Sequence, residues 1–477
     1  MQRKSINYIA LTTIPFVSLL IFMNLFNNFY VKIVMYAVNY LFLILTFLKQ
    51  KKYNILSMQF LFTVYHMAYI GLCPIFLVIQ YLMMNRKSVL LSTIIKDPDF
   101  FNKQCLFILL SYYVFLIATT VFSNDKNIDY SSKNVIKASD NKVIHYSKTI
   151  SILMIIISFI LEAIYLVKNR NLLFSGSLES GRITAMAGNG IFLYGMWLGT
   201  FALAMLYEIV LRKDFSSKLF WLICFTHMFS IALIGFKSRL IVLALFLLII
   251  HNRYEKIEFK KIIKLGIIGV ILVGGLTIAR NSMSGVESSS FLETIVTSFG
   301  NGSVNMYYVL RQFPKYTPYQ YGYTYLINLI MLAPGSQPDF TIWLKNQIGI
   351  SFSGGGVTPT LLGEAWINFG FFGIIITFFM VGLLCNKLDK WYYKTKNVYF
   401  IVLIVWVVTS SVRGGFSNSL INLILYSFMN LILIMLFKKS RGDKNGKFSI
   451  VWCGRRNSKS WWLYYYAMYY GWNGFLF

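Results

Sequence analysis

The chain has 477 residues, of which 57% are hydrophobic and only 13% are charged. A soluble protein cannot cover that much apolar surface, because its exterior must remain largely polar. The formal net charge of +28 would suit a nucleic-acid-binding protein, but the basic residues cluster in short segments between apolar runs, so we expect no nucleic-acid partner.

Apolar runs recur along the chain, each long enough to cross about 30 Å of hydrocarbon as a helix. They predict an all-α polytopic membrane protein with about twelve transmembrane helices. The third run carries Pro74 and is expected to be kinked. In chain order, the predicted spans are roughly 6–26, 29–48, 55–82, 104–122, 149–167, 189–211, 218–235, 239–251, 262–279, 361–384, 398–412 and 419–437.

The distribution of lysine and arginine predicts the orientation of these spans. If the N-terminus is cytoplasmic, the inner segments hold 30 of the 45 basic residues. The alternation fails only at 83–103, where four basic residues fall outside: Arg86, Lys87, Lys96 and Lys103. The positive-inside rule therefore predicts a multi-pass plasma-membrane protein with both termini in the cytoplasm.

One connection differs from the others. Residues 280–360 join two spans on the outer side and contain five of the eight prolines. Within them, the apolar segment Tyr323–Leu332 is only about ten residues long, too short to cross the bilayer. It is expected to be a re-entrant or interfacial helix. Long ordered loops are usually functional, although a simple cap over the helices is the alternative interpretation.

The sequence suggests two parts of unequal size. Residues 1–437 are expected to form the transmembrane domain, with 280–360 as its external loop. Residues 438–477 are expected to be a cytoplasmic tail, first basic and then rich in tryptophan and tyrosine. These aromatic residues could lie at the membrane interface, but an extension without function is an equally good interpretation.

Several outer arginines stand beside glycine or serine at the ends of predicted spans. A planar guanidinium grips phosphate with two parallel hydrogen bonds, so such a group could surround an anion at the membrane surface. Interfacial arginines that point toward lipid headgroups are the alternative. The four arginines concerned are Arg182, Arg239, Arg280 and Arg413.

Glu364 stands at the start of a long apolar run, just after the turn Gly354-Gly355-Gly356. A charge in hydrocarbon costs about 2.5–3.5 kcal/mol on insertion scales, so we expect the carboxylate to be used. It could accept a proton from a sugar hydroxyl, or it could pair structurally with an outer arginine. Nearby, Tyr321 and Tyr323 could belong to an interfacial belt.

Metal and cofactor chemistry has little support in the sequence. In the predicted topology no histidine lies outside, and the five cysteines form no CxxC pair, so neither a zinc site nor a disulfide framework is expected. The chain also lacks a P-loop and a dinucleotide fingerprint. We therefore expect no metal and no cofactor.

The run at 355–373, Gly-Gly-Val-Thr-Pro-Thr-x-x-Gly-Glu-Ala-x-x-Asn-Phe-Gly-x-x-Gly, resembles the signature of bacterial oligosaccharide repeat-unit polymerases. These are the O-antigen and capsule polymerases. The resemblance covers about 150–437, while the first 150 residues match only in general layout. Its supporting features are the Tyr321–Tyr325 box, the Gly235–Arg239 hairpin, Arg280 and Arg413-Gly414-Gly415.

This resemblance implies a glycosyltransferase of the bacterial inner membrane, with the architecture of the C-type lipid-linked glycosyltransferases. Its substrate would be an oligosaccharide on undecaprenyl pyrophosphate, which activates the donor without metal or nucleotide. Arg239 and Arg280 would clamp the pyrophosphate, and Arg182 and Arg413 would contact phosphate or glycan. Glu364 would position the acceptor or serve as the base, and Tyr321 and Tyr323 could stack on sugar rings of the glycan. Membrane lipid and a chain-length regulator are the further partners considered.

Two other functions remain open at this stage. An O-antigen ligase would resemble this architecture, but ligases are expected to use an external histidine, and the predicted topology places none outside. A flippase or transporter of the same lipid-linked oligosaccharide would need charged residues deep in the membrane and broken helices in matched halves. Glu162 and Glu208 are the main deep acids in the predicted spans.

Overall fold

The computed structural model shows an all-helical protein. No strand occurs among the residues that it describes. These are 28–50, 57–83, 88–121, 141–173, 190–234, 237–255, 257–283, 290–330, 339–350, 356–394 and 398–420, with isolated positions at 13, 17, 18, 21, 423, 424 and 427.

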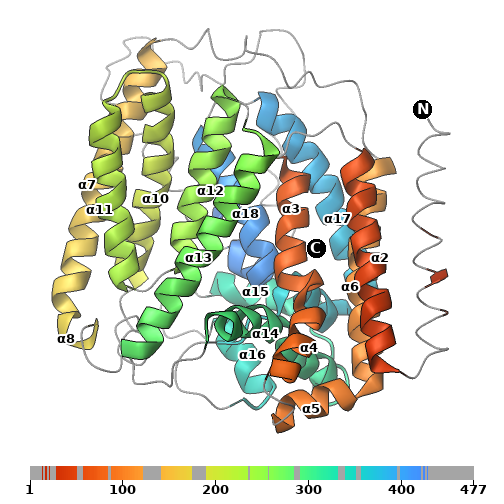
Figure 1. The fold of residues 1–477 in the computed structure, drawn as a ribbon. Helices are drawn as coiled ribbons and strands as arrows, with labels where there is room; N and C mark the ends of the chain where they lie inside the picture. Colours follow the sequence, from red (N-terminus) through yellow and green to blue (C-terminus); the bar gives the residue numbers. More distant parts are fainter. Residues whose placement is uncertain are drawn as a thin grey trace. The chain divides into compact units, whose positions relative to one another are not determined.

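The helices follow the apolar runs closely (Figure 1). They cover every predicted span from 29–48 to 398–412, while 6–26 and 419–437 fall mostly outside the described residues. A further helical segment, 416–420, follows α18. The bounds are α2 (Phe29–Gln50), α3 (Met58–His66), π-helix η1 (Met67–Gly71), α4 (Cys73–Met83), α5 (Val89–Lys96), α6 (Pro98–Val121), α7 (Asn141–Lys168), α8 (Arg170–Leu173), α10 (Gly190–Leu211), α11 (Ser217–Ile234), α12 (Lys237–Tyr254), α13 (Phe259–Met283), α14 (Phe291–Gln312), α15 (Tyr323–Ile330), α16 (Phe340–Gln347), α17 (Thr360–Lys394) and α18 (Val398–Gly414).

Six helical stretches among the described residues are long and apolar enough to cross a membrane: Phe29–Lys49, Met58–Met83, Pro98–Val121, Lys148–Lys168, Ser217–Ile234 and Thr360–Trp391. Two shorter apolar helices, Gly195–Leu211 and Ile401–Gly414, add to them. The protein is therefore an all-helical membrane protein, as predicted, and the count of about twelve spans stays a prediction.

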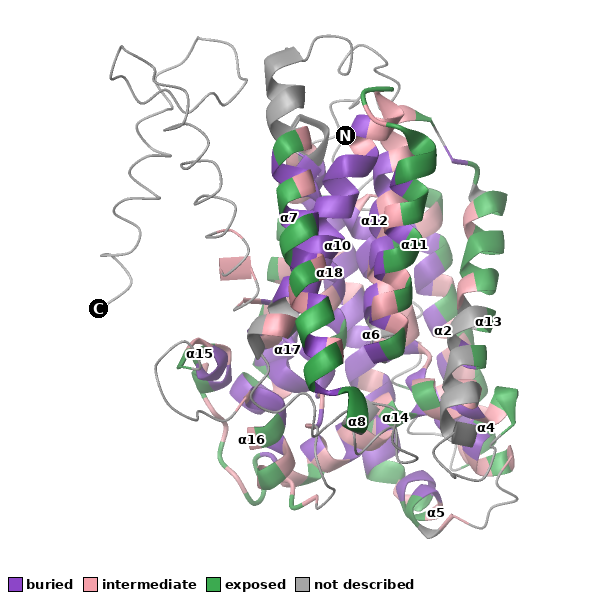
Figure 2. Cartoon of the chain, turned by 90° about the vertical axis from the view of Figure 1, so that its left-hand side faces the viewer, coloured by how far each residue is buried: buried purple, intermediate pink, exposed green. Residues whose placement is uncertain are grey.

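Most exposed side chains along α7 and α11 are apolar, which is the pattern expected of a surface in contact with lipid. Figure 2 shows exposed residues along the outward faces of α7 and α11 and buried residues in the α10 and α18 helices behind them. Ile160 of α7 is 54% exposed, and Phe229 of α11 is 66% exposed. Such surfaces would be unstable in water, so they support a membrane environment.

The predicted interruption at Pro74 is present. The third predicted span divides into α3, the π-helix η1 and α4, and Pro74 is the second residue of α4. Proline lacks an N–H group but fits in the first turn of a helix, where that group would have no intrahelical partner. The hydroxyl of Tyr36 on α2 donates a hydrogen bond to the Gly71 carbonyl at 2.6 Å, which ties α2 to the break.

A second break, in α17, corrects the prediction that 361–384 is one regular span. The backbone leaves the helical region at Phe369 (φ −138°) and Gly370 (φ 58°, ψ −138°). A Cβ atom at Gly370 would lie only 2.6 Å from the Tyr319 hydroxyl oxygen. Glycine is thus required both for the positive φ and for the close approach. The break leaves a short half-helix, 360–368, ahead of the longer segment.

The segment 280–360 is more regular than expected. The predicted short helix is present as α15, but α14, a helix of 22 residues, is an addition that the apolar pattern did not predict. The α14, α15 and α16 helices lie together near the end of α18 (Figure 1). Tyr307 of α14 packs in a buried cluster with Leu77, Ile94 and Phe100, so this segment belongs to the core of the protein.

The same cluster includes residues of α5, which lies in the connection 83–103, where the alternation of basic residues fails. The α5 helix therefore lies at the same end of the molecule as α14. Both connections, 83–103 and 280–360, were predicted to be external, and both lie at the same end of the helices.

The chain divides into two units, Met1–Ile434 and Met435–Phe477. The predicted tail, 438–477, lies outside the described residues, and its cytoplasmic location stays a prediction.

Candidate active site

The half-helix at the start of α17 carries two buried polar side chains on one face. Glu364 and Asn368 are four residues apart, so they lie one turn from each other, and both are completely buried. Thr324 of α15 is also completely buried and joins them: its hydroxyl donates to Glu364 Oε1 at 3.3 Å. A buried carboxylate needs such partners, because burial without them is costly.

Glu364 receives its other hydrogen bonds from the first residues of the 416–420 helical segment. The N–H of Phe416 donates to Oε2, and the N–H of Ser417 lies 3.3 Å from both carboxylate oxygens. The first N–H groups of a helix have no intrahelical acceptor and carry partial positive charge. The Glu364 side chain thus caps the N-terminus of the 416–420 helical segment from a distant part of the chain. This explains how a charge at the start of an apolar run is tolerated.

Gly415 allows this close approach. Its φ of 86° lies in the left-handed region, and an added Cβ would lie 2.5 Å from Glu364 Oε2. A side chain at this position would therefore displace the carboxylate. The Arg413-Gly414-Gly415 motif and the motif at 355–373 are brought into direct contact here.

Asn368 connects the same half-helix to the tyrosine box. Its Nδ2 donates to Thr324 Oγ1 at 2.6 Å and to the Glu364 carbonyl at 2.9 Å. Its Oδ1 accepts a hydrogen bond from the N–H of Gly322 at 2.9 Å. Both the NH₂ group and the carbonyl oxygen of the side-chain amide are thus hydrogen-bonded, which fixes the orientation of the amide.

The break after the half-helix leaves carbonyl groups without intrahelical partners, and the tyrosine box supplies donors for them. The N–H of Gln320 donates to the Ile367 carbonyl at 3.0 Å, and the N–H of Tyr321 donates to the Asn368 carbonyl at 3.0 Å. The box Tyr321–Tyr325 is therefore docked onto the end of the half-helix by its backbone.

A second set of amides ties α15 and α16 to the end of α18. The N–H of Phe340 donates to Asn328 Oδ1 at 2.8 Å, and Asn328 Nδ2 donates to Asn418 Oδ1 at 2.8 Å. Asn418 in turn donates to the Gly414 carbonyl at 3.0 Å. We refer to the side chains of Thr324, Asn328, Glu364, Asn368 and Asn418 as the polar network. It unites three motifs that are far apart in sequence.

Exposed tyrosines border this largely buried network. Tyr321 is 75% exposed with φ 46°, and its ring meets Phe369 edge-on at 6.3 Å. Tyr323 is 45% exposed, and its ring centroid lies 6.3 Å from that of Trp343. Burial, followed by the nearby Glu364 carboxylate, raises the pKa of Tyr325 to about 12. That phenol is therefore neutral at physiological pH, while Tyr321 and Tyr323 present open aromatic faces.

Arg413 and Arg239 occupy different environments. Arg413 is exposed on the last turn of α18, with its guanidinium carbon 5.8 Å from the centre of the Tyr69 ring in η1. Arg239 is buried near the start of α12: Nη1 lies 3.3 Å from Met196 Sδ, and the guanidinium carbon lies 5.0 Å from the Trp197 ring. Both arginines thus lie against aromatic rings, an arrangement favourable to a cation.

The remaining predicted arginines are described only in part. The backbone of Arg280 belongs to α13, but its side chain lies outside the described residues. Arg182 lies wholly outside them. Convergence of the four arginines on one anion therefore stays a prediction. Trp197, which packs on Arg239, also contacts Trp406 of α18 at 5.2 Å, and this contact links Arg239 to the helix that carries Arg413.

The sequence analysis missed most of the polar network. Asn328 and Asn418 were not candidates, and Thr324 and Asn368 were included only as parts of motifs. One signal was available: Asn368 follows Glu364 by four residues in an apolar run, so the two share a helix face. Across the described part of the chain, histidine, cysteine and acidic residues form no group of three suited to a metal ion.

The fold and this site define a polytopic helical membrane protein with a largely buried polar network at one end of its helices. The chain matches the family model for O-antigen polysaccharide polymerase Wzy over residues 7–445, and it belongs to that family. This confirms the resemblance and extends it over the first 150 residues. Searches of curated proteins and of solved structures each found no match.

Proposed function

We propose that this protein joins undecaprenyl-pyrophosphate-linked oligosaccharide repeat units at the outer face of the bacterial plasma membrane. The family match over residues 7–445 carries this proposal, because Wzy proteins are O-antigen polymerases. The polar network also supports it. The Tyr321–Tyr325 box, the motif at 355–373 and Arg413-Gly414-Gly415 meet there, as expected if the three motifs build one site. In this proposal the chain has about twelve spans, cytoplasmic termini and the architecture of the C-type lipid-linked glycosyltransferases.

The proposed reaction is a glycosyl transfer. A hydroxyl of the acceptor unit attacks the anomeric carbon of the growing glycan, the bond between that carbon and the pyrophosphate oxygen breaks, and undecaprenyl pyrophosphate leaves. The hydroxyl proton passes to a base or to the leaving group. The pyrophosphate already activates the donor, so the proposal requires neither a metal nor a nucleotide. Negative charge grows on the leaving oxygens, and fixed cations stabilise it in a partly dry site.

Arginines are the proposed source of that stabilisation. Arg413 is exposed at the end of α18 and is free to meet a phosphate from solvent. Arg239 is buried against Trp197, so its role as a clamp requires the pyrophosphate to enter between α10 and α12. Arg280 and Arg182 complete the proposed set. Each lost arginine contact is expected to cost on the order of 3 kcal/mol, roughly 10²-fold in rate.

Glu364 has a different proposed role. It accepts its described hydrogen bonds from backbone N–H groups and from the Thr324 hydroxyl, and the side chain is completely buried. We therefore propose it as a positioning residue that fixes the end of α18 against the tyrosine box. Tyr321 and Tyr323 are the proposed glycan contacts, because each offers an exposed ring face.

One observation favours the transporter alternative. Glu162 of α7 and His227 of α11 form a buried pair, with Oε1 and Nδ1 2.7 Å apart, and deep ionisable pairs are typical of transport pathways. The two functions differ in what a deletion strain accumulates. A polymerase mutant displays single repeat units on its surface, whereas a transporter mutant retains carrier-linked units inside.

The direct test uses the full chain reconstituted in liposomes. Its substrate is the lipid-linked repeat unit extracted from the deletion strain. The expected product is a ladder of glycans that differ by one repeat unit. Liposomes that move the repeat unit across the bilayer without lengthening it would contradict the proposal. A chain-length regulator is a proposed partner, and adding membranes that contain one would narrow the ladder without being needed for its formation.

A further inference from the structure

A buried polar group lies in the part of the protein that carries Arg239. Glu162 of α7 and His227 of α11 form a pair with Oε1 and Nδ1 2.7 Å apart, and Ser158 Oγ donates to the same carboxylate oxygen at 2.8 Å. On the other side of the imidazole, Nε2 lies 3.2 Å from the hydroxyl oxygen of Thr200 on α10. All these side chains are buried. The polymerase function proposed above assigns no role to them.

Two glycines of α10 allow this arrangement. Gly195 and Gly199 are four residues apart, the spacing at which small residues on one helix face let a neighbouring helix approach closely. A Cβ atom at Gly199 would lie 2.3 Å from Ser158 Oγ and 2.7 Å from His227 Cε1. One at Gly195 would lie 2.4 Å from Leu161 Cδ1. The α10 helix is thus packed tightly against α7, behind the exposed faces of α7 and α11 (Figure 2).

Thr200 connects the Glu162–His227 pair to the surroundings of Arg239. Its hydroxyl lies 3.2 Å from the carbonyl oxygen of Met196, one turn nearer the start of α10, and can donate to it while accepting from the imidazole. The sulfur of Met196 lies 3.3 Å from Arg239 Nη1, and the ring of the next residue, Trp197, lies 5.0 Å from the guanidinium carbon. Printed contacts thus connect the pair to Arg239 through α10.

A second contact follows the same route. Tyr165 follows Glu162 by three residues, so both lie on one face of α7. Tyr165 packs in a buried cluster with Met196 and with Ile234 of α11. The face of α7 that carries Glu162 therefore also supports the methionine that contacts Arg239.

Stability alone does not account for the pair. Glu162 Oε2 has no hydrogen-bond partner among the described residues, although the side chain is 1% exposed. The desolvation of two ionisable groups is offset only where their remaining lone pairs and protons find partners, and an apolar pair of similar volume is often at least as stable. A buried pair that is incompletely satisfied, and that supports a proposed phosphate contact, is better explained by the group that it positions.

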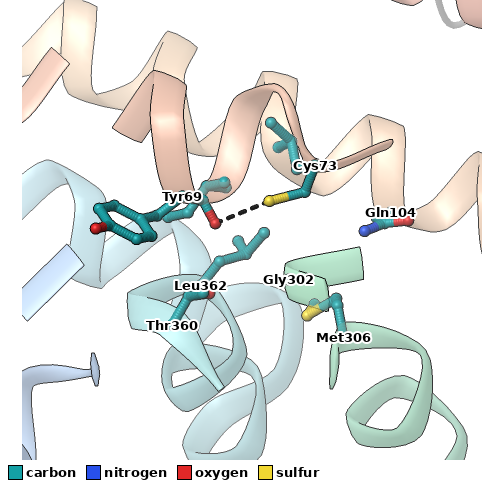
Figure 3. Close-up of a pocket in the computed structure, with 9 residues that line it drawn as sticks. Tyr69, Cys73, Gln104, Gly302, Met306, Thr360 and Leu362 are labelled. Atoms are coloured by element: carbon teal, nitrogen blue, oxygen red, sulfur yellow. Dashed lines mark hydrogen bonds between the residues drawn. The ribbon is translucent and has the colours of Figure 1, made fainter. Parts of the chain in front are cut away.

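Arg413 has a separate support. Its guanidinium lies against the Tyr69 ring, and the thiol of Cys73 donates to the Tyr69 carbonyl at 3.0 Å, as the dashed line in Figure 3 shows. The small pocket beside these residues is lined by uncharged residues from η1, α4, α6, α14 and α17. Neither α7 nor α11 contributes to it, so Arg413 provides a reference against which the effect of Glu162 on Arg239 is measured.

We infer that Glu162 and His227 are positioning residues of the polymerase. Through Thr200 they hold α10 in the place that directs Arg239 toward the departing pyrophosphate. The inference rests on the polymerase function proposed above and gives that function a use for a deep ionisable pair. Charge grows on the pyrophosphate oxygens only as the bond to the anomeric carbon breaks, so a displaced guanidinium loses its effect mainly in the transition state. The pair therefore acts on kcat more than on KM.

The test is a double-mutant cycle on the full chain in liposomes, with the repeat unit extracted from the deletion strain as substrate. Glu162→Gln is expected to lower kcat about tenfold with KM nearly unchanged. In the Arg239→Ala background the same substitution should lower kcat by no more than about twofold, because the guanidinium that it displaces is already absent. Combined with Arg413→Ala, its effect of about tenfold should persist. A tenfold loss that also persists in the Arg239→Ala background would overturn the inference.

Glu208→Gln is the matched control for structural damage. Glu208 also lies on α10, where its Oε1 pairs with Arg212 Nη2 at 2.5 Å and accepts a hydrogen bond from the Tyr254 hydroxyl of α12 at 2.9 Å. Its replacement removes a carboxylate that joins two helices of the same group, but this carboxylate lies three turns along α10 from Met196. Any effect of Glu208→Gln on kcat should be the same with and without the Arg239 guanidinium. An effect that disappears in Arg239→Ala would indicate general loosening of the helices and would contradict a specific role for Glu162.

Thr200→Val covers the case in which Glu162→Gln does not fold. Valine has nearly the volume of threonine and removes only the hydroxyl that joins His227 to α10, so kcat should again fall and the loss should again depend on Arg239. Thr200→Ser keeps the hydroxyl and should recover most of the lost kcat. An unchanged kcat in a folded Thr200→Val protein would overturn the inference.

The same measurements separate this inference from the function on which it rests. If Arg239→Ala polymerises at the wild-type rate, the positioning role is refuted and the polymerase function stands. A wild-type protein that makes no polymer refutes the function and the positioning role together.

Discussion

Replacing Glu364 by glutamine tests whether this carboxylate holds the site together. In the structure it accepts hydrogen bonds from the N–H groups of Phe416 and Ser417 and from the hydroxyl of Thr324. Glutamine has nearly the same shape, but one of its terminal atoms is a donor. That NH₂ group would face backbone N–H groups, so at least one buried donor would lose its acceptor.

The magnitude follows from these contacts. A buried donor left without a partner costs about 1–3 kcal/mol. Loss of a negative charge at a helix N-terminus costs a further ~0.5–1 kcal/mol. We therefore expect Glu364→Gln to lower the free energy of unfolding by about 1.5–4 kcal/mol and to lower polymerisation with it. The measurement is thermal unfolding of the purified protein in detergent, together with the glycan ladder from liposomes.

Glu255→Gln is the matched control. The Glu255 side chain is 79% exposed and lies 3.6 Å from His251 on the neighbouring helical turn, so its loss should change stability by less than about 0.5 kcal/mol. If Glu364→Gln unfolds at the same temperature as this control while polymer formation is lost, the carboxylate acts in the chemistry and not as a cap. If both stability and activity survive, Glu364 has neither role.

Three further predictions concern single residues. Gly370→Ala should destabilise the protein by about 1–3 kcal/mol through its positive φ and its contact with Tyr319, whereas Gly269→Ala, which meets no neighbour within 4 Å, should be neutral or stabilising in the same unfolding assay. Arg413→Ala should leave the melting temperature unchanged, because the side chain is exposed, and slow polymer formation about 10²-fold; full-length ladders at the normal rate would remove it from the site. Arg239→Ala should reduce surface glycan to single repeat units, and Arg239→Lys should fold but polymerise poorly, since lysine keeps the charge and lacks the planar fork; long chains in both variants would exclude this role.

Local properties of the chain made much of this protein predictable. A transmembrane helix is defined by a continuous apolar run, so these runs identified a helical membrane protein, and the helices follow the runs from 29–48 to 398–412. The interruption at Pro74 was predictable for a similar reason, because proline acts on its own helix. The motif at 355–373 was sufficient to indicate the family that the match over residues 7–445 confirms.

The site depended on relations that no local pattern contains. The α14 helix was missed because its polar and small residues reduce the apolar signal, although it packs against α4 in the core. The break at Gly370 requires both a positive φ and the Tyr319 hydroxyl nearby. The sequence could show that a charge at Glu364 has a high free-energy cost in an apolar run. Only the tertiary structure identified the backbone groups that stabilise it. Those groups belong to Phe416 and Ser417, more than 50 residues away, and a buried charge is tolerated only where the whole fold supplies its partners.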